Sequence, residues 1–149
     1  MNFITNTVEE TIEIGRRIGK SLKPGDIVCI DGDLGSGKTH LTKGIALGLG
    51  IDEHITSPTF NIVNEYEGRL KFYHFDVYRV NDPDEIAAIG FDEYIFSDAA
   101  SVIEWSDYIS ELIPDEHIQI RITKESETRR SISIQWFGKR YDYMKEVLQ

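Results

Sequence analysis

The residue types that could do chemistry are concentrated in the stretch DGDLGSGKTH, residues 31–40. Gly32, Gly37, Lys38 and Thr39 fit the pattern G-x-x-x-x-G-K-[ST], in which a loop surrounds the phosphates of a nucleotide. Glycines let backbone N–H groups approach an anion, and the N-terminus of the following helix adds a favourable dipole. Lys38 would reach the β- and γ-phosphates, and the Thr39 hydroxyl would bind Mg²⁺. The alternative, a glycine-rich turn without a ligand, is disfavoured because all four defining positions match.

Two acidic residues could complete a magnesium site beside this loop. Magnesium at a phosphate loop commonly needs a carboxylate, direct or through water, at the end of a neighbouring strand. Asp76 follows the segment LKFYHF and Glu104 follows SVI, so each lies near the end of an apolar segment. Either acid alone would be read as a solvated residue at a strand end. Given the loop, we expect at least one of them to be functional, and the sequence leaves open which one contacts the metal directly.

The remaining nucleophilic and metal-binding residue types give weaker signals. His74 and Asp76 are two residues apart and therefore share one face of a strand. The other histidines show no ligand spacing relative to them, which argues against a dedicated transition-metal site. His74 is expected to pack or form a hydrogen bond near the nucleotide. Cys29 lies within an apolar run and, without a partner that lowers its pKa, is expected to be a small hydrophobic residue with no catalytic role.

Three further features bear on the nucleotide. The hydroxyl-rich stretch TSPTF, residues 56–60, could sense a γ-phosphate or could be an ordinary Ser-Pro turn, and the sequence does not decide. Trp105 could border the site beside Glu104, although tryptophan is more often a core residue. GTPases select guanine with Asn or Thr, then Lys, any residue and Asp. The nearest match, TKES at 123–126, lacks the final Asp, so ATP is favoured over GTP.

The segments around the loop have the order that such a loop needs. The pattern predicts a helix over 8–22 with a capping box at Thr7, and the apolar run IVCI at 27–30 predicts a buried strand. A second helix should follow the loop and end near Gly48 or Gly50. The apolar face expected for the first helix consists of Val8, Ile12, Gly15, Ile18 and Leu22. Strand, glycine loop and helix therefore follow one another as required.

The rest of the chain predicts further strands and short helices. The segments at 60–66 and 70–78 predict a hairpin, and Asp82 is expected to cap a helix that begins at Pro83. SVIEW predicts a strand, DYISELI a brief helix, HIQIRIT and RSISIQW two more strands, and RYDYMKEVLQ a final helix. We therefore expect an α/β fold: a P-loop NTPase three-layer sandwich with a mixed, mostly parallel central sheet and antiparallel additions.

Length, cysteine content and charge limit the possible classes. The 149 residues suit one domain, residues 1–149, and a single cysteine excludes an intramolecular disulfide. The first residues lack the regions of a signal peptide and no apolar run could span a bilayer, so a cytoplasmic protein is expected. The net charge of −10 argues against direct holding of nucleic acid, because such binding needs clustered Lys and Arg. The scattered basic residues Lys124, Arg129, Arg130, Lys139 and Arg140 could be a local exception or a solvated surface.

The combination GDLGSGKTHLTKG, TSPTF, FYHFDVYR and VIEW closely resembles the TsaE (YjeE) family, bacterial P-loop ATPases of tRNA threonylcarbamoyladenosine synthesis. The resemblance extends from the first helix to about Pro114 and is only architectural beyond it. It implies binding of ATP and Mg²⁺ and action with TsaD and TsaB, whose complex modifies the adenosine beside the anticodon of tRNAs that read ANN codons. ATP hydrolysis would reset that complex between turnovers, and tRNA would be contacted only indirectly.

The resemblance also implies roles for particular residues. Lys38, Asp76 and Glu104 would be catalytic, with Thr39 and Glu104 as magnesium ligands. The nucleotide-binding residues it implies are Gly35, Ser36, Gly37, Lys38, Thr39 and His40. Trp105 and the TSPTF stretch would border the site. His40 departs from the second Thr that the family often has, which should affect fine tuning more than phosphate binding.

Neither an arginine finger nor a water-positioning Gln is readable, so we expect slow hydrolysis by the isolated chain and faster hydrolysis with partners. Two alternatives remain open at this stage. A small-molecule kinase would share the loop but would need an acceptor-binding cluster and an arginine-bearing lid, neither of which is evident. A non-enzymatic assembly factor would use ATP binding alone to control docking.

Overall fold

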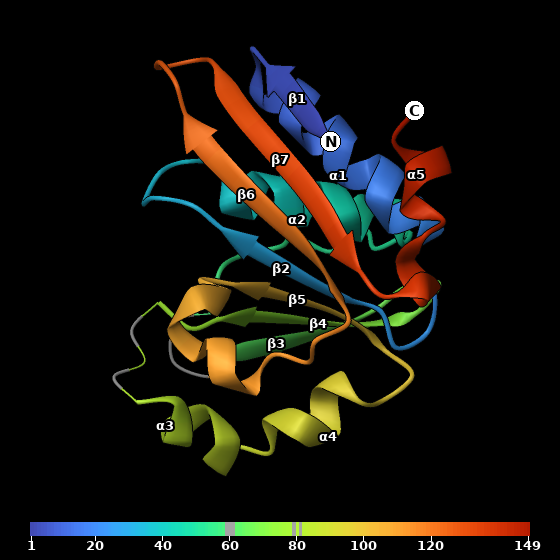
Figure 1. Ribbon diagram of the computed structural model, residues 1–149, viewed down its shortest axis with the longest axis vertical. Helices are drawn as coiled ribbons and strands as arrows, with labels where there is room; N and C mark the ends of the chain where they lie inside the picture. The colour runs from blue at the N-terminus through green and yellow to red at the C-terminus, as the bar shows by residue number, and fades with distance from the viewer. Residues whose placement is uncertain (59–61, 79, 81) are drawn as a thin grey trace.

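A twisted sheet of seven strands runs through the described part of the chain (Figure 1). The structure is a computed structural model, and it describes residues 1–58, 62–78, 80 and 82–149. The strands are β1 (Asn2–Thr5), β2 (Ile27–Asp31), β3 (Val63–Glu67), β4 (Lys71–Asp76), β5 (Ala100–Glu104), β6 (His117–Lys124) and β7 (Arg130–Phe137). The α-helices are α1 (Val8–Ser21), α2 (Lys38–Gly48), α3 (Pro83–Ala88), α4 (Phe91–Ile95) and α5 (Met144–Val147), and the 3-10 helices are η1 (Ser106–Leu112) and η2 (Lys139–Tyr141).

The strand order is β1-β7-β6-β2-β5-β4-β3. β6, β2, β5 and β4 form a parallel centre, whereas β3 pairs with β4, β7 with β6 and β1 with β7 in antiparallel fashion. The predicted α/β sandwich, with parallel strands near the loop and antiparallel additions, is therefore confirmed. The parallel pairing also places the carboxyl ends of β2, β5 and β4 at one edge of the sheet, which is where α/β folds bind ligands.

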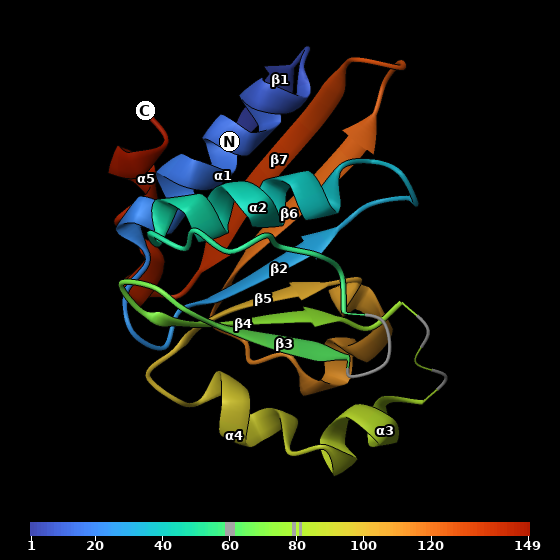
Figure 2. The same cartoon turned by 180° about the vertical axis from the view of Figure 1, so that it is seen from behind.

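Helices cover both faces of the sheet, so β2 is buried along its whole length. Its side chains alternate between two cores: Val28 and Ile30 pack with α1 and α2, whereas Ile27 and Cys29 pack with α3, α4 and η1. Figure 2 shows α1 and α2 lying side by side over β2, β6 and β7. Residues 27–30 of β2 form a continuous apolar run because side chains on both faces of this strand are covered by helices, as the sequence predicted.

Glycines bring α1 and α2 into backbone contact. A Cβ atom added at Gly44 would lie 2.1 Å from the carbonyl oxygen of Ile12, and one added at Gly19 would lie 2.1 Å from that of Ile45. These distances leave no room for a side chain, so the two helices can pack this closely only because glycine is present. Residues later in α1 contact residues later in α2: Gly15 meets Leu41, and Gly19 meets Ile45. The helices are therefore parallel, and the beginning of α1 lies beside the beginning of α2.

The sequence predicted most elements, but it missed one strand and misplaced the apolar face of one helix. The short strand β1 was not expected. In α1, Val8 is 46% exposed, while Ile14 is buried, so the apolar face is rotated from the predicted one. The capping at Thr7 is confirmed by a hydrogen bond from the Glu10 N–H to the Thr7 hydroxyl. The Glu10 carboxylate accepts its reciprocal bond from the N–H of Asn6 rather than from that of Thr7.

The final helix predicted for the C-terminal segment is wrong in its extent, because η2 and α5 replace it as two short pieces. Two tyrosines explain the break. Tyr141 is fully buried, and its hydroxyl accepts a hydrogen bond from the Ile27 N–H at 2.9 Å, while the Tyr143 hydroxyl donates to the buried carboxylate of Asp26. Both contacts bind the C-terminal segment to the start of β2.

None of the helices within the described residues has the length and apolar character that crossing a membrane requires.

Candidate nucleotide-binding site

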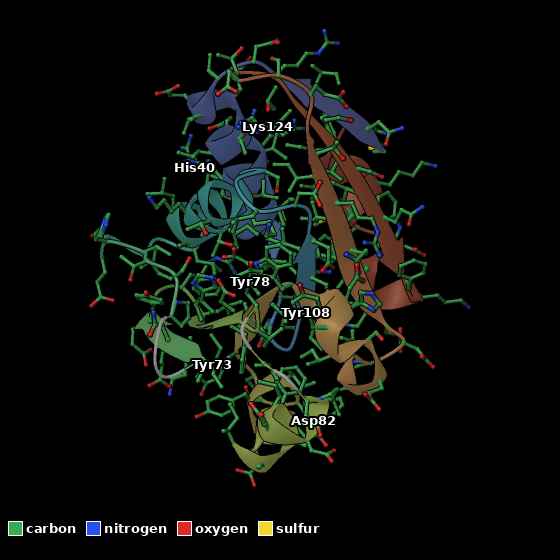
Figure 3. All side chains as sticks on the ribbon, turned by 90° about the vertical axis from the view of Figure 1, so that its left-hand side faces the viewer. His40, Tyr73, Tyr78, Asp82, Tyr108 and Lys124 are labelled. Carbon is green, nitrogen blue, oxygen red and sulfur yellow. The ribbon has the colours of Figure 1, made fainter. Side chains whose placement is uncertain are left out.

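The predicted phosphate loop lies between β2 and α2 at the carboxyl edge of the sheet, the edge that Figure 3 faces. Gly35 and Gly37 adopt left-handed backbone conformations with φ of 79° and 112°, which favour glycine. A Cβ atom at Gly32 would lie 2.3 Å from the carbonyl oxygen of Ile122, so this position also requires glycine. Gly37 caps α2 without a side-chain hydrogen bond from the described residues. The first N–H groups of α2 are thus available to an anion.

Lys38 is held inside the loop. Its ammonium donates to the carbonyl oxygens of Gly32 at 2.7 Å and Asp33 at 2.8 Å, and the residue is 5% exposed. The ammonium also lies 3.8 Å from the centre of the Trp105 ring, a cation–π contact. Burial lowers the pKa of Lys38, and the negative charge of nearby Glu104 partly offsets this effect. The lysine is therefore a desolvated positive charge at the base of the loop.

Glu104 connects the end of β5 to the helix that follows the loop. It is 1% exposed, and one carboxylate oxygen accepts a hydrogen bond from the Thr39 hydroxyl at 3.1 Å. The other oxygen accepts from the Thr42 hydroxyl at 3.0 Å and bonds the buried Nε2 of His74 at 2.5 Å. The prediction that His74 forms a hydrogen bond near the site is confirmed. Thr42 was missed, although its position three residues after Thr39 places both hydroxyls on one side of α2.

The donor set around Thr39 fits a magnesium ion. The Thr39 and Ser57 hydroxyl oxygens are 3.1 Å apart, and the Thr39 hydroxyl is also 3.1 Å from a carboxylate oxygen of Glu104. All three supply oxygen, which is the ligand type that Mg²⁺ prefers. The described residues contain no group of three or more His, Cys, Asp and Glu suited to a metal. Such a sparse protein set suits Mg²⁺, which commonly uses one or two carboxylates together with substrate phosphates and water.

Asp76 lies beside Glu104, because β4 and β5 pair these two residues directly. Its carboxylate accepts a hydrogen bond from the Tyr78 N–H at 3.0 Å. Burial raises the pKa of Asp76 above its usual range, and the N–H of Tyr78 opposes that shift. Unlike Glu104, Asp76 is only partly buried, and no side chain of the described residues hydrogen-bonds its carboxylate. The two acids that sequence analysis could not tell apart thus have different surroundings.

A cavity of about 500 Å³ opens above the loop. Its walls come from the phosphate loop, the start of α1, the ends of β4 and β5, and the connection between β6 and β7. Ser57 and Trp105 line the cavity, as the family resemblance implied, and the lining residues that were not predicted are Asn6, Thr7, Val8, Thr11, Leu34, Tyr78, Glu127, Thr128 and Arg130. The volume is within the range of small-molecule sites. The start of α1 reaches the cavity because the glycine contacts hold it beside α2.

Arg130 is a site residue that sequence reasoning had assigned only to the scattered basic tail. Its Nε donates to the carbonyl oxygen of Ser36 at 2.7 Å, and its Nη1 donates to that of Ser126 at 2.8 Å. Arg130 thus joins the phosphate loop to the β6–β7 connection. No local pattern identifies this role, because it depends on how the last hairpin folds back over the loop.

Two aromatic side chains, Trp105 and Tyr78, line one side of the cavity, and Tyr108 packs against both of them. Trp105 lies with its ring centre 4.5 Å from that of Tyr78 and 5.7 Å from that of Tyr108. Tyr78 and Tyr108 lie next to one another in Figure 3. Trp105 follows β5 with a left-handed backbone, φ 63°, which is uncommon for a large side chain. Residue type alone favoured a core position for Trp105, whereas the family resemblance implied the border, and the structure places the residue at the cavity wall.

The other predicted contact residues divide between the site and its surroundings. His40 lines the cavity, and its buried Nδ1 has no hydrogen-bond partner among the described residues. Burial lowers the pKa of His40. In the TSPTF stretch, Ser57 lines the cavity, while residues 59 and 60 lie outside the described residues. Cys29 is fully buried away from the cavity, and burial raises the pKa of its thiol to about 12, so it has no nucleophilic character at neutral pH.

Comparisons with known proteins show which family the chain is similar to. The family model described as "Threonylcarbamoyl adenosine biosynthesis protein TsaE" matches residues 5–132. A Bacillus subtilis protein named tRNA threonylcarbamoyladenosine biosynthesis protein TsaE is 43% identical over 99% of this chain and 93% of its own. A protein of the same name from Treponema pallidum is 36% identical over 90% of this chain and 99% of its own.

A solved structure is also similar over nearly the whole chain. The crystal structure of YdiB from Bacillus subtilis superposes with a TM-score of 0.84 at 37% sequence identity, covering 99% of this chain and 93% of that one. The family match extends through β6 into β7, beyond the point near Pro114 at which motif resemblance ends. The chain belongs to the TsaE family.

Proposed function

We propose that this chain binds and hydrolyses ATP with Mg²⁺, as a single P-loop ATPase domain over residues 1–149 that serves tRNA threonylcarbamoyladenosine synthesis in the cytoplasm. One observation carries the proposal: Lys38, Thr39 and Glu104 converge where the buried strand β2 meets the uncapped start of α2. The names of the relatives support the pathway.

Residues 35–40 would hold the triphosphate. The N–H groups at the start of α2 and the glycine positions of the loop offer hydrogen bonds and a positive dipole. The Lys38 ammonium would exchange the carbonyl oxygens of Gly32 and Asp33 for phosphate oxygens, which carry more negative charge. Because Lys38 is already desolvated, this exchange costs little further dehydration, and its charge acts strongly on the phosphates.

Thr39 and Glu104 would hold the magnesium ion. When bound, Mg²⁺ would neutralise charge on the transferring phosphoryl group. The carboxylate of Glu104 is fixed in advance by Thr42 and His74, so its orientation does not have to be established when substrate binds. Ser57 could add its hydroxyl to the same set, since it already contacts Thr39.

Asp76 is the better candidate for orienting the attacking water. Its carboxylate is less enclosed than that of Glu104 and lies at the cavity wall beside it. A raised pKa makes a carboxylate a stronger base, which favours contact with a water proton. Glu104, with its oxygens bonded to Thr39, Thr42 and His74, is suited to the metal instead. We therefore assign water positioning to Asp76 and metal binding to Glu104.

The nucleoside would occupy the rest of the cavity. Asn6, Thr7, Thr11 and Thr128 offer hydrogen-bonding groups on its walls, and Val8 and Leu34 offer apolar surface. Small-molecule sites commonly combine apolar walls with a few polar groups in this way. The mixed lining can therefore accept a purine base and ribose beyond the phosphates.

The proposed partners are TsaD and TsaB, with ATP hydrolysis resetting their complex between rounds of modification. The net charge of −10 supports an indirect relation to tRNA, because extended contact with a polyphosphate backbone requires clustered positive charge. Of the arginines whose placement is described, Arg130 alone lines the cavity, and its Nε and Nη1 are bonded to backbone carbonyls. This arrangement supports slow hydrolysis in isolation and stimulation by partners.

The direct test is steady-state ATP turnover by the purified chain, alone and with TsaB and TsaD, with phosphate release measured against Mg²⁺ concentration. We expect slow Mg²⁺-dependent release by the chain alone, faster release in the complex and none with Lys38→Ala. Equal rates with and without partners would contradict the stimulation. An Asp76→Asn variant that binds ATP without cleaving it, yet supports repeated rounds of modification, would favour a nucleotide-dependent assembly factor instead.

A further inference from the structure

A second buried carboxylate, that of Asp31, lies next to the phosphate loop but outside the proposed chemistry. Asp31 is the last residue of β2 and is 3% exposed. One carboxylate oxygen accepts hydrogen bonds from the Ser106 hydroxyl at 2.5 Å and the Gln119 amide at 2.7 Å, and the other accepts from the Asp107 N–H at 3.0 Å. A buried carboxylate with three donors is an ordered junction of β2, β6 and η1.

This junction lies on the face of the sheet opposite to the phosphate loop's helix. Side chains alternate along a strand, so Asp31 shares a face with Cys29, which packs with α3, α4 and η1. Ile30, on the other face, packs with α2. The Asp31 side chain is also not among the residues that line the cavity. The carboxylate is therefore not part of the cavity wall, and it can act on the site through its negative charge, which favours the charged form of Lys38, or through the residues that it holds.

Two residues beside this junction, Gly32 and Trp105, contact the Lys38 ammonium. Asp31 directly precedes Gly32, whose carbonyl oxygen accepts a hydrogen bond from the Lys38 ammonium. Ser106 directly follows Trp105, whose ring lies 3.8 Å from the same ammonium. The hydrogen bond between Asp31 and Ser106 thus joins the end of β2, directly before the loop, to the turn that carries the aromatic ring.

Trp105 needs such support because of its backbone. It has φ 63° and ψ 34°, a left-handed conformation that a large side chain adopts only where the surrounding structure imposes it. The Trp105 N–H donates to the Ile30 carbonyl oxygen at 3.0 Å, which fixes the start of the turn. Asp31 fixes the two following residues, Ser106 through its hydroxyl and Asp107 through its N–H. Both sides of the strained residue are therefore bonded to consecutive residues of β2.

We propose that Asp31 is a positioning residue, which holds the turn after β5 against the phosphate loop and so keeps the Trp105 ring on the Lys38 ammonium. The catalytic part of this inference rests on the proposed ATPase function. The structural part does not, because the contact between Trp105 and Lys38 exists in the protein without nucleotide.

The test uses Trp105 as a reporter. Trp136 is the second tryptophan of the chain, so the Trp136→Phe background leaves Trp105 as the only source of tryptophan emission. Asp31→Ala in this background removes all three hydrogen bonds. The matched control is Arg121→Ala, which removes an exposed ion pair to the side chain of Asp107 in the same turn and leaves Asp31 intact. Emission maximum, acrylamide quenching and the unfolding midpoint are measured without nucleotide, and kcat and KM for MgATP are measured with partners present.

We expect Asp31→Ala to shift Trp105 emission to longer wavelength and to increase its quenching constant about twofold or more in protein that is still folded. We expect kcat to fall about tenfold, because a displaced Lys38 loses transition-state stabilisation, with KM changed less than threefold because the loop amides still bind the phosphates. Arg121→Ala should match the parent in each measurement.

Ser106→Ala removes one of the three hydrogen bonds, so it should shift Trp105 emission and kcat in the same direction as Asp31→Ala but by a smaller amount. If Asp31→Ala does not fold, Ser106→Ala is used in its place. A folded Asp31→Ala with parental Trp105 emission and kcat would overturn the proposal, as would a loss of stability without change in either readout. A parent without ATPase activity would instead reject the proposed function, and the fluorescence comparison would still decide the role of Asp31.

Discussion

Glu104 accepts a hydrogen bond from the Thr39 hydroxyl at 3.1 Å while His74 and Thr42 hold its second oxygen in the protein interior. The two proposed magnesium ligands are thus in contact before any metal binds, and their orientations are fixed by neighbours from α2 and β4. Hydrogen bonds that hold a metal ligand in place in this way commonly strengthen metal binding about 10- to 100-fold.

Glu104→Gln should separate metal binding from folding. The amide keeps the shape of the side chain but loses the negative charge that Mg²⁺ requires, so we expect the Mg²⁺ concentration for half-maximal turnover to rise about tenfold or more. The amide group must also face the hydroxyl donor of Thr42, which should lower stability by about 1–3 kcal/mol. Magnesium titration of phosphate release and thermal unfolding check both effects. Glu111→Gln, at an exposed position of η1, is the control and should change neither.

Thr42→Val tests the support of Glu104 without touching a ligand. The substitution keeps the volume of the side chain but removes its hydroxyl, so one buried carboxylate oxygen loses a donor. We expect a loss of about 1–2 kcal/mol in the free energy of unfolding and a smaller rise in the required Mg²⁺ concentration than in Glu104→Gln. Denaturant unfolding and the same magnesium titration measure the two quantities. An effect on metal dependence larger than that of Glu104→Gln would contradict the assigned roles.

Asp76→Asn should stop hydrolysis and stabilise the fold at neutral pH. Burial raises the pKa of Asp76 in the folded state, so between its ordinary and raised pKa values the native protein binds more protons than the unfolded chain. Stability is therefore lost as pH rises through this interval, and the neutral amide avoids that loss. We expect Asp76→Asn to have the higher unfolding midpoint near pH 7, with the difference shrinking as pH falls below the raised pKa. A difference that grows in acid would contradict the shift.

The pH dependence of turnover should also report Lys38. Burial lowers the pKa of Lys38 from 10.5, and the protonated form is the one that stabilises phosphate charge. The kcat/KM for MgATP should therefore decline as alkaline pH removes this proton from the free protein, with a midpoint below 10.5. The pH profile of kcat/KM measures this decline, because kcat/KM reports the ionisation of groups in the protein without substrate. A profile that stays flat through pH 10.5 in stably folded protein would contradict a lowered pKa.

The glycine contact between α1 and α2 should be sensitive to a single methyl group. At Gly44 an added Cβ would lie 2.1 Å from the Ile12 carbonyl oxygen, so Gly44→Ala must push the helices apart. We expect the free energy of unfolding to fall by about 1–3 kcal/mol or more. Nucleotide binding should also weaken, because the start of α1 lines the cavity. Leu47→Ala, at a position of α2 that is 52% exposed, is the control. Denaturant unfolding and nucleotide titration compare the two variants.

Local patterns could predict the phosphate loop and its flanking elements because the physical requirements lie within a few residues. Glycine must occupy positions such as Gly37, and an apolar strand must be followed at once by a helix. Asp76 and Glu104 were each predicted near a strand end, and the structure adds that parallel pairing of β4 with β5 sets them side by side. These features confirm the predicted fold and bring the predicted acids together.

Other features depend on contacts between distant segments and could not be read locally. Arg130 reaches Ser36 only because the last hairpin folds back over the loop, and Asp31 meets Ser106 across 75 residues of sequence. The rotated apolar face of α1 has a similar cause, since glycines rather than large side chains face α2. The short strand β1 owes its conformation to pairing with β7 rather than to its own four residues.

The roles assigned to the loop all depend on one property: its amides, glycines and Lys38 bind the phosphates of a nucleotide. Isothermal titration calorimetry of the folded protein with ATP and Mg²⁺, in the presence of TsaB and TsaD, measures this binding. We expect saturable uptake of about one ATP per chain, weakened at least tenfold by Lys38→Ala. If the folded parent protein takes up no ATP under these conditions, the loop does not bind phosphate.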